Sequence, residues 1–332
     1  MHRINQTEKS VDKIEETTFA AIGMKENDLE EMIRSDIQML EGEEVSLLVI
    51  GKQVRNERKG RSDLTAIDAN GNIVLIEIKR DRQDIEQRNE PFEFQAIRYA
   101  ASYATIKTKD ELVQTVYAPY LEKYGDHAQK GELTYAEWGH RILDDFLAKN
   151  EAGVRFNEKQ RIILAASDYD DLTLSSVAWL SQNGVDLSCY TLTPYLIGEE
   201  AYMHVDKLIP SIEYDDYYIN LDRPAGTAPR TARDKPALKR RSLPKIDKLL
   251  AWGAVKAGDV IEAKDKPDKA VLLENGNVEA GGEEMSLQVW LKNLYGWSSI
   301  QTYVFAIHQA SGKSLSAIRR DYMERDLDLG SE

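Results

Sequence analysis

The chain has 332 residues, of which 42% are hydrophobic and 30% are charged; this balance is typical of a globular protein and leaves room for two separate cores. No apolar run approaches the about 20 residues of a membrane-spanning helix, and the N-terminal stretch lacks the apolar region of a secretion signal. The only cysteine, Cys189, cannot form an internal disulfide, so we expect a cytoplasmic protein without a membrane partner and interpret Cys189 as a core residue.

The net charge of −14 at first argues against a nucleic-acid partner, but the charge is unevenly distributed. Residues 1–222 carry a net charge of −17 and residues 223–332 a net charge of +3. Within the acidic part, a basic cluster comes directly before Asp63, and Arg80, Arg82 and Arg88 follow Lys79. The members of that basic cluster are Lys52, Arg55, Arg58, Lys59 and Arg61.

The first elements in the chain are a polar stretch, a helix and a strand. Residues 1–25 are polar, and we expect them to be partly helical. Apolar residues recur at helical spacing from Glu26 to Leu40, which predicts a helix, and the continuous apolar run from Val45 to Ile50 predicts a buried strand. The basic loop over 52–61 follows.

The stretch from Arg61 to Arg80 is typical of two strands joined by a tight turn. Side chains alternate faces along a strand, so Glu77 and Lys79 point the same way. A loop with an odd number of residues places Asp63 opposite Glu77 on that face, whereas a two-residue loop places them on opposite faces.

Charged groups on these apolar strands are costly to bury unless something compensates them. We expect that compensation to be Mg²⁺, with Mn²⁺ able to substitute, held by Asp63, Glu77 and the carbonyl of Ile78. The metal would activate a water and neutralise charge on a phosphate, while Lys79 orients the water or stabilises the developing charge. The alternative is a strand-end salt bridge between Glu77 and Lys79 or Arg80.

These residues resemble the PD-(D/E)xK nuclease signature. The phrase GRSDLTAIDANGNIVLIEIKR is especially similar to the C-terminal nuclease domain of NucS-type endonucleases. The resemblance implies a restriction-endonuclease-like mixed α/β sheet flanked by helices, with Asp63 and Glu77 as metal ligands and Lys79 as the catalytic lysine. Ser62 stands where the name-giving proline of the signature would be.

The resemblance also implies an acidic residue on the first helix that assists the metal. Glu26 matches best by its surrounding phrase, and Glu30 is the second choice. An ordinary acidic helix start, favoured by the helix dipole, is the alternative explanation for both.

A helix over 91–103 carries a further site element. Its spacing Gln95-x-x-x-Tyr99 is similar to the Q-x-x-x-Y element of RecB-type nucleases, which implies that Gln95 bonds near the metal or a phosphate and that Tyr99 packs or touches the DNA backbone. A core glutamine satisfied by the backbone is the alternative. We expect Arg55, Arg58, Lys59 and Arg61 to contact phosphates, the alternative being a solvated loop.

The rest of the first domain extends the sheet. Two helices over 109–122 and 134–148 are interpreted as an insertion, at about 107–150, that forms a wall of the cleft. A strand over 161–166, a helix over 172–182 and a strand over 187–192 continue the fold, and 200–221 is irregular with room for an added strand. The three aspartates before the second of these helices, Asp168, Asp170 and Asp171, are interpreted as structural.

A linker and a second domain complete the chain. Residues 223–242 are rich in proline, alanine and basic residues, which is typical of a linker. Residues 243–332 predict a small α+β domain without a catalytic set, and the phrases GAVKAGDVI and SLQVWLKNLYGWSS resemble RAMA-type domains. That resemblance implies DNA binding.

Together these features predict a Mg²⁺-dependent endodeoxyribonuclease that acts in restriction, phage defence or DNA repair, with DNA as its partner and either a monomeric or a homodimeric state. About 25 residues precede Glu26, too few for the N-terminal β domain of the NucS arrangement, so we do not expect mismatch-specific cleavage. The alternative function is a non-catalytic DNA-binding protein built on a nuclease-like scaffold.

Overall fold

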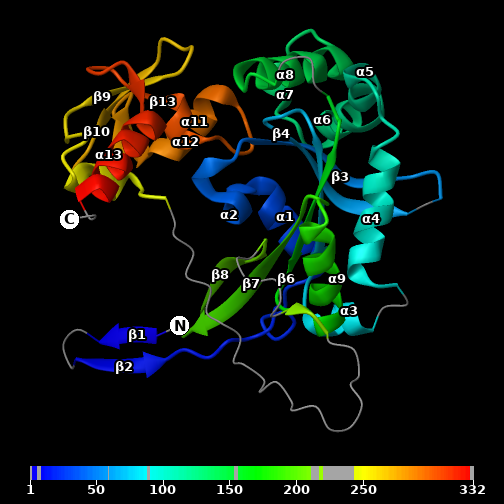
Figure 1. Ribbon diagram of the computed structural model, residues 1–332. Helices are drawn as coiled ribbons and strands as arrows, with labels where there is room; N and C mark the ends of the chain where they lie inside the picture. The colour runs from blue at the N-terminus through cyan, green and yellow to red at the C-terminus, as the bar shows by residue number, and fades with distance from the viewer. Residues whose placement is uncertain are drawn as a thin grey trace.

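A six-stranded mixed sheet forms the centre of the computed structural model (Figure 1). The described residues are 2–5, 9–58, 60–87, 90–152, 156–210, 217–219 and 243–329. Lys59, Arg88 and the expected linker at 223–242 therefore lie outside the described residues.

The sheet has the strand order β3-β4-β5-β6-β7-β8. The first three strands and the last pair are antiparallel, whereas β5, β6 and β7 run parallel. The bounds are β3 (Leu47–Arg55), β4 (Arg61–Asp68), β5 (Ile73–Lys79), β6 (Gln160–Ala166), β7 (Leu187–Ile197) and β8 (Glu200–Ile209). The predicted mixed α/β sheet is confirmed. The added strand for which residues 200–221 had room is β8.

Helices cover both faces of this sheet. The face with Leu64, Val74 and Ile76 packs against α1 (Glu26–Ser35) and α2 (Gln38–Glu41). The face with Ile67 and Leu75 packs against α4 (Phe92–Tyr103) and α9 (Asp171–Gln182). The short helix α3 (Arg82–Glu86) follows β5.

The expected single helix over 26–40 is two helices. Asp36 leaves the helical conformation, with φ −142° and ψ 70°, so α1 ends at Ser35 and α2 begins at Gln38. The apolar spacing continues across this break because Ile33 and Ile37 pack into the same core. Periodicity alone therefore did not reveal the break.

The loop between β4 and β5 settles the arrangement of the central hairpin. Ile67 pairs with Ile73, and the Asp68 amide donates to the Asn72 carbonyl at 3.0 Å. Three residues remain for the loop, and its last residue, Gly71, has a φ of +82° that favours glycine. The odd-numbered alternative is confirmed, and extending this register places Asp63 opposite Glu77.

The predicted insertion at about 107–150 is helical. Its elements are α5 (Lys109–Leu112), a π-helical segment (Val113–Tyr117), α6 (Ala118–Tyr124), α7 (His127–Lys130) and α8 (Tyr135–Lys149). They pack beside β3, and their buried residues include Tyr117, Trp138 and Phe146. These buried aromatic side chains thus serve for helix packing.

The N-terminal stretch differs from the prediction. In place of a partial helix it forms a hairpin of β1 (His2–Asn5) and β2 (Ser10–Lys13), and Glu16 then forms a bridge with Tyr195 at the end of the sheet. A stretch this polar carries no periodic apolar signal, so backbone pairing decides its structure.

Two sequence interpretations concern buried or capping polar groups. Cys189 is fully buried in β7, and burial raises the pKa of its thiol, which confirms a core residue. Asp170 accepts a hydrogen bond from the Thr173 amide at 2.9 Å and caps α9, which confirms its structural role.

The C-terminal part has an antiparallel sheet of its own, with the order β12-β11-β10-β9-β13-β14. Its strands are β9 (Val260–Ala263), β10 (Lys269–Leu272), β11 (Asn277–Ala280), β12 (Glu283–Ser286), β13 (Ala306–His308) and β14 (Lys313–Ser314). Its helices are α10 (Ile246–Ala251), α11 (Leu287–Tyr295), α12 (Thr302–Phe305) and α13 (Leu315–Leu329). The predicted small α+β unit is confirmed, and its helix α11 begins at Leu287, directly after strand β12.

This unit contacts the edge strand β3 of the central sheet. The Ser299 amide donates to the Leu47 carbonyl at 2.8 Å, and the Val49 amide donates to the Ser298 hydroxyl at 2.9 Å. Arg319 also forms an ion pair with Glu44 just before β3. These bonds satisfy backbone groups that an exposed sheet edge would leave unpaired.

No helix in the described part of the chain is both long enough and apolar enough to cross a bilayer.

Trp297 offers a test of this packing. Its buried ring contacts Phe146 of α8 as well as Tyr295 and Phe305 within the C-terminal unit. We expect Trp297→Ala to lower the free energy of unfolding by about 3–5 kcal/mol, because the lost ring leaves a cavity between the two parts. Trp179, whose ring is largely exposed on α9, is the matched control, and Trp179→Ala is expected to change stability by about 0.5 kcal/mol or less. Equal losses for the two variants in urea denaturation would contradict this packing.

Candidate active site

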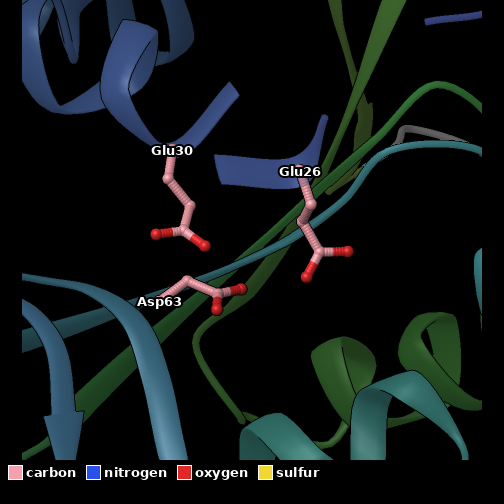
Figure 2. A group of neighbouring side chains, drawn as sticks. All are labelled: Glu26, Glu30 and Asp63. Carbon is pink, nitrogen blue, oxygen red and sulfur yellow. The ribbon is translucent and has the colours of Figure 1, made fainter. Parts of the chain in front are cut away.

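Three carboxylates meet where α1 passes the ends of the central strands. Glu26 and Glu30 lie four residues apart on α1, so they share one face of the helix, and Asp63 extends from β4 (Figure 2). Each offers a carboxylate oxygen, and these oxygens lie within 4.8 Å of one another. The structure thus brings both α1 candidates to the site, where the sequence left a choice between them.

Lys79 binds the oxygens of this cluster. Its Nζ donates to Oε1 of Glu26 at 3.0 Å and to the carbonyl of Ile78 at 2.5 Å, and it lies 3.9 Å from Oδ2 of Asp63. The Asp63 carboxylate is itself fixed, since its Oδ2 accepts the Ile78 amide at 2.8 Å. The expected ligand oxygens of Asp63 and Ile78 therefore already surround a positive charge.

Within the cluster, the ionised form of Glu30 is electrostatically unfavourable. Glu30 is 4% exposed, and burial, followed by the nearby charge of Asp63, raises the pKa of its carboxyl above the ordinary value. Its neighbour Glu31 behaves oppositely: hydrogen bonds from Arg34 lower the pKa of Glu31 to about 2. Ionised Glu30 is thus a cost to the folded protein, whereas ionised Glu31 stabilises it.

Two residues of β3 that sequence reasoning did not assign to the site contact Glu30. The side-chain amide of Gln53 donates to both Glu30 oxygens, at 2.9 and 3.3 Å, and Nζ of Lys52 lies 3.8 Å from Glu30 and 2.9 Å from Glu31. Lys52 belongs to the basic cluster that precedes Asp63, but it was not among the residues expected to contact phosphates. Its side chain is only 5% exposed and is paired with these carboxylates.

Glu77 is wholly buried in β5, facing the same side as Asp63. It does not belong to the group of carboxylates that lie within 4.8 Å of one another. Burial raises the pKa of the Tyr103 hydroxyl to about 12, and the charge of Glu77 contributes to the rise. The role of Glu77 as a metal ligand stays a prediction.

A cavity of about 500 Å³ opens over the carboxylate cluster. It brings together most of the residues that the sequence singled out, and Gly60 lies beside them. The lining residues are Glu26, Arg55, Gly60, Arg61, Asp63, Lys79, Gln95 and Tyr99. Arg58 is exposed at the β3–β4 turn and does not line the cavity. None of the lining residues comes from 107–150, so the insertion does not form the expected wall of this cavity.

Two arginines face each other at this cavity. Arg55 and Arg61 are cross-strand partners at the ends of β3 and β4, where like charges repel. The Arg61 amide donates to the hydroxyl of Tyr99 at 2.9 Å, and a Cβ at Gly60 would meet the Tyr99 ring at 2.8 Å. The turn is therefore fixed against α4, and both arginines line the cavity together with Glu26 and Asp63.

The start of α1 is tied to the end of β5. Asp81, just past Lys79, is buried and accepts the amides of Phe19 and Ala20 at 3.2 and 3.1 Å. This link fixes the segment before Glu26 against the strand that carries Lys79. A second cavity, of about 430 Å³, also has Glu26 and Lys79 in its lining. Its other lining residues are Lys25, Arg80, Asp84 and Gln87.

The opposite electrostatics of Glu30 and Glu31 predict opposite mutational effects. We expect Glu30→Gln to raise the melting temperature of metal-free protein at pH 8, because the raised pKa means that ionised Glu30 destabilises the fold. The gain shrinks as the pH falls toward the ordinary pKa of 4.5, because the folded wild-type carboxyl takes up its proton above that value. Glu31→Gln is the matched control: we expect it to lower the melting temperature at pH 8, with a loss that fades toward pH 2. A loss at pH 8 for Glu30→Gln as large as that of Glu31→Gln would contradict this description.

The comparisons with known proteins assign no family. No family model matches the chain, and no curated protein matches its sequence. One similar solved structure is described as the structure of an EndoMS–dsDNA2 complex, with 15% identity over 50% of this chain and a TM-score of 0.24. The match spans 44% of that chain, so less than half of the neighbour's length is covered.

Proposed function

We propose that this cavity is the active site of a metal-dependent endonuclease that hydrolyses phosphodiester bonds in DNA. The observation that carries the proposal is the cluster of Glu26, Glu30 and Asp63. Two of its members, Glu26 and Asp63, also pair with Lys79 and line an open cavity. Carboxylates this close repel one another, and a divalent cation offsets that repulsion.

The donor set fits Mg²⁺, with Mn²⁺ as a substitute. Its oxygens are hard ligands, and the ammonium of Lys79 already contacts three of the groups that would hold the metal. Asp63 and Glu30 would hold the ion, and Glu26, Glu77 and the carbonyl of Ile78 would complete the set. When bound, the metal would lower the pKa of a coordinated water and neutralise charge on the phosphate.

The residues of the chain supply the other parts of the reaction. Lys79 lines the cavity, so its ammonium is placed to orient a water or to stabilise charge that develops on the phosphate. Gln95 lines the same cavity and is proposed to bond near the metal or a phosphate oxygen. Arg55, Arg61 and Tyr99 are proposed to hold the DNA backbone, and binding a phosphate relieves the repulsion between the two arginines.

A non-catalytic DNA-binding protein is the alternative, and the arginine pair alone would support it. A binding scaffold gains nothing from three clustered carboxylates, because they repel phosphate. We therefore favour catalysis and place the protein in restriction, phage defence or DNA repair within the cytoplasm. The C-terminal unit is proposed to be the RAMA-type module that binds DNA.

Substitution of Asp63 separates the two functions. We expect Asp63→Asn to reduce Mg²⁺-dependent nicking of plasmid DNA by at least about a hundredfold, because it removes a metal ligand while leaving the fold intact. Lys79→Met is expected to block cleavage as well but to retain metal binding. Glu57→Gln, at the exposed turn between β3 and β4, is the control and is expected to cut normally. Nicking by Asp63→Asn at the wild-type rate would show that the carboxylate cluster is not the metal site.

The arginine pair predicts a change in salt dependence. Neutralising two phosphate contacts with Arg55→Gln and Arg61→Gln is expected to reduce the slope of log affinity against log salt by about 2. Lys159→Gln is the matched control, because exposed Lys159 lies beside Asn72 at the opposite end of β5 from Lys79. If the double variant and the control show the same slope as the wild type in equilibrium DNA binding, the DNA path lies elsewhere.

A further inference from the structure

Gln53 has a backbone conformation that its residue type disfavours. Its φ is +54°, in the left-handed region that costs L-residues other than glycine about 1–2 kcal/mol. It lies in β3 just past a register shift between Val49 and Gly51, and it falls between the pairs Lys52–Leu64 and Val54–Ser62. That register places Gln53 across from Asp63.

The left-handed conformation of Gln53 affects the contacts between β3 and α1. Consecutive residues of a regular strand point to opposite faces, yet both Lys52 and Gln53 reach the same helix. Lys52 binds Glu30 and Glu31, and the amide of Gln53 donates to both oxygens of Glu30. The left-handed turn at Gln53 lets both side chains reach α1.

The geometry points to Gln53 as a positioning residue that holds the Glu30 carboxylate toward Asp63 for a divalent cation. This inference rests on the proposed function. A neutral amide suits the task because it fixes the carboxylate through hydrogen bonds without adding a positive charge that would compete with the metal. Groups that orient metal ligands in this way commonly contribute 10–100-fold to metal affinity.

Packing is the competing explanation for this contact, since buried Glu30 needs hydrogen-bond donors with or without a metal. The positioning role and the packing explanation can be separated with a glycine substitution at Gln53. Gln53→Gly removes the amide and also relieves the left-handed strain, whereas Gln53→Ala removes the amide and keeps the strain. A positioning role predicts that both variants lose metal affinity, whatever happens to their stability.

The test measures Mn²⁺ binding by calorimetry without DNA, together with melting of the metal-free protein. We expect Gln53→Ala and Gln53→Gly to weaken Mn²⁺ binding about tenfold or more, while Gln53→Gly melts at a higher temperature than Gln53→Ala. The Mn²⁺ concentration for half-maximal nicking is expected to rise by the same factor, with most of the rate recovered at saturating Mn²⁺. Glu57→Gln, in the same hairpin, is expected to match the wild type.

Two results would overturn this inference, and they are distinguishable. If the wild type binds Mn²⁺ and Gln53→Gly binds it equally well, the positioning role is wrong and the proposed function stands. If the wild type binds no Mn²⁺ and behaves like Asp63→Asn in the same titration, the proposed function fails and the positioning role fails with it.

Discussion

The charge balance at Lys79 is the constraint on which the site depends. An ammonium that is 2% exposed in a central strand of the sheet is stable only with compensating oxygens. Lys79 has them on α1, on β4 and at the Ile78 carbonyl of its own strand. The position of α1 is therefore tied to β5 by charge as well as by the apolar contacts of Leu29 and Ile33. The same arrangement concentrates negative charge around one point of an open cavity, which is what a site for a divalent cation requires.

Strand β3 connects this site with the C-terminal unit. Its first half bonds to Ser298 and Ser299, and its second half carries Lys52, Gln53 and Arg55 into the site. The C-terminal unit is thus docked along the edge of the central sheet rather than merely tethered to it. If this unit binds DNA, the docking fixes how that DNA would run relative to the cavity.

Much of the site was predictable because it rests on local patterns. Strand alternation offered two arrangements of Asp63 and Glu77, and the three-residue loop of the structure selects the one in which they lie opposite each other. Helical spacing placed Gln95 and Tyr99 on one side of α4, which is the cavity side. Gln53 and the internal pairing of Lys52 were not predictable, because they depend on a register shift and one left-handed residue that leave no mark in residue type. The N-terminal hairpin was missed because short polar strands lack apolar periodicity.

The most direct test of the central claim is a crystal structure grown with Mn²⁺, read by anomalous scattering. We expect one strong peak among the oxygens of Asp63, Glu30 and Ile78, with the ammonium of Lys79 displaced from the Ile78 carbonyl. An absent peak at saturating Mn²⁺, with Lys79 still bonded to Ile78 and Glu26, would contradict it and identify the cluster as an internal salt bridge.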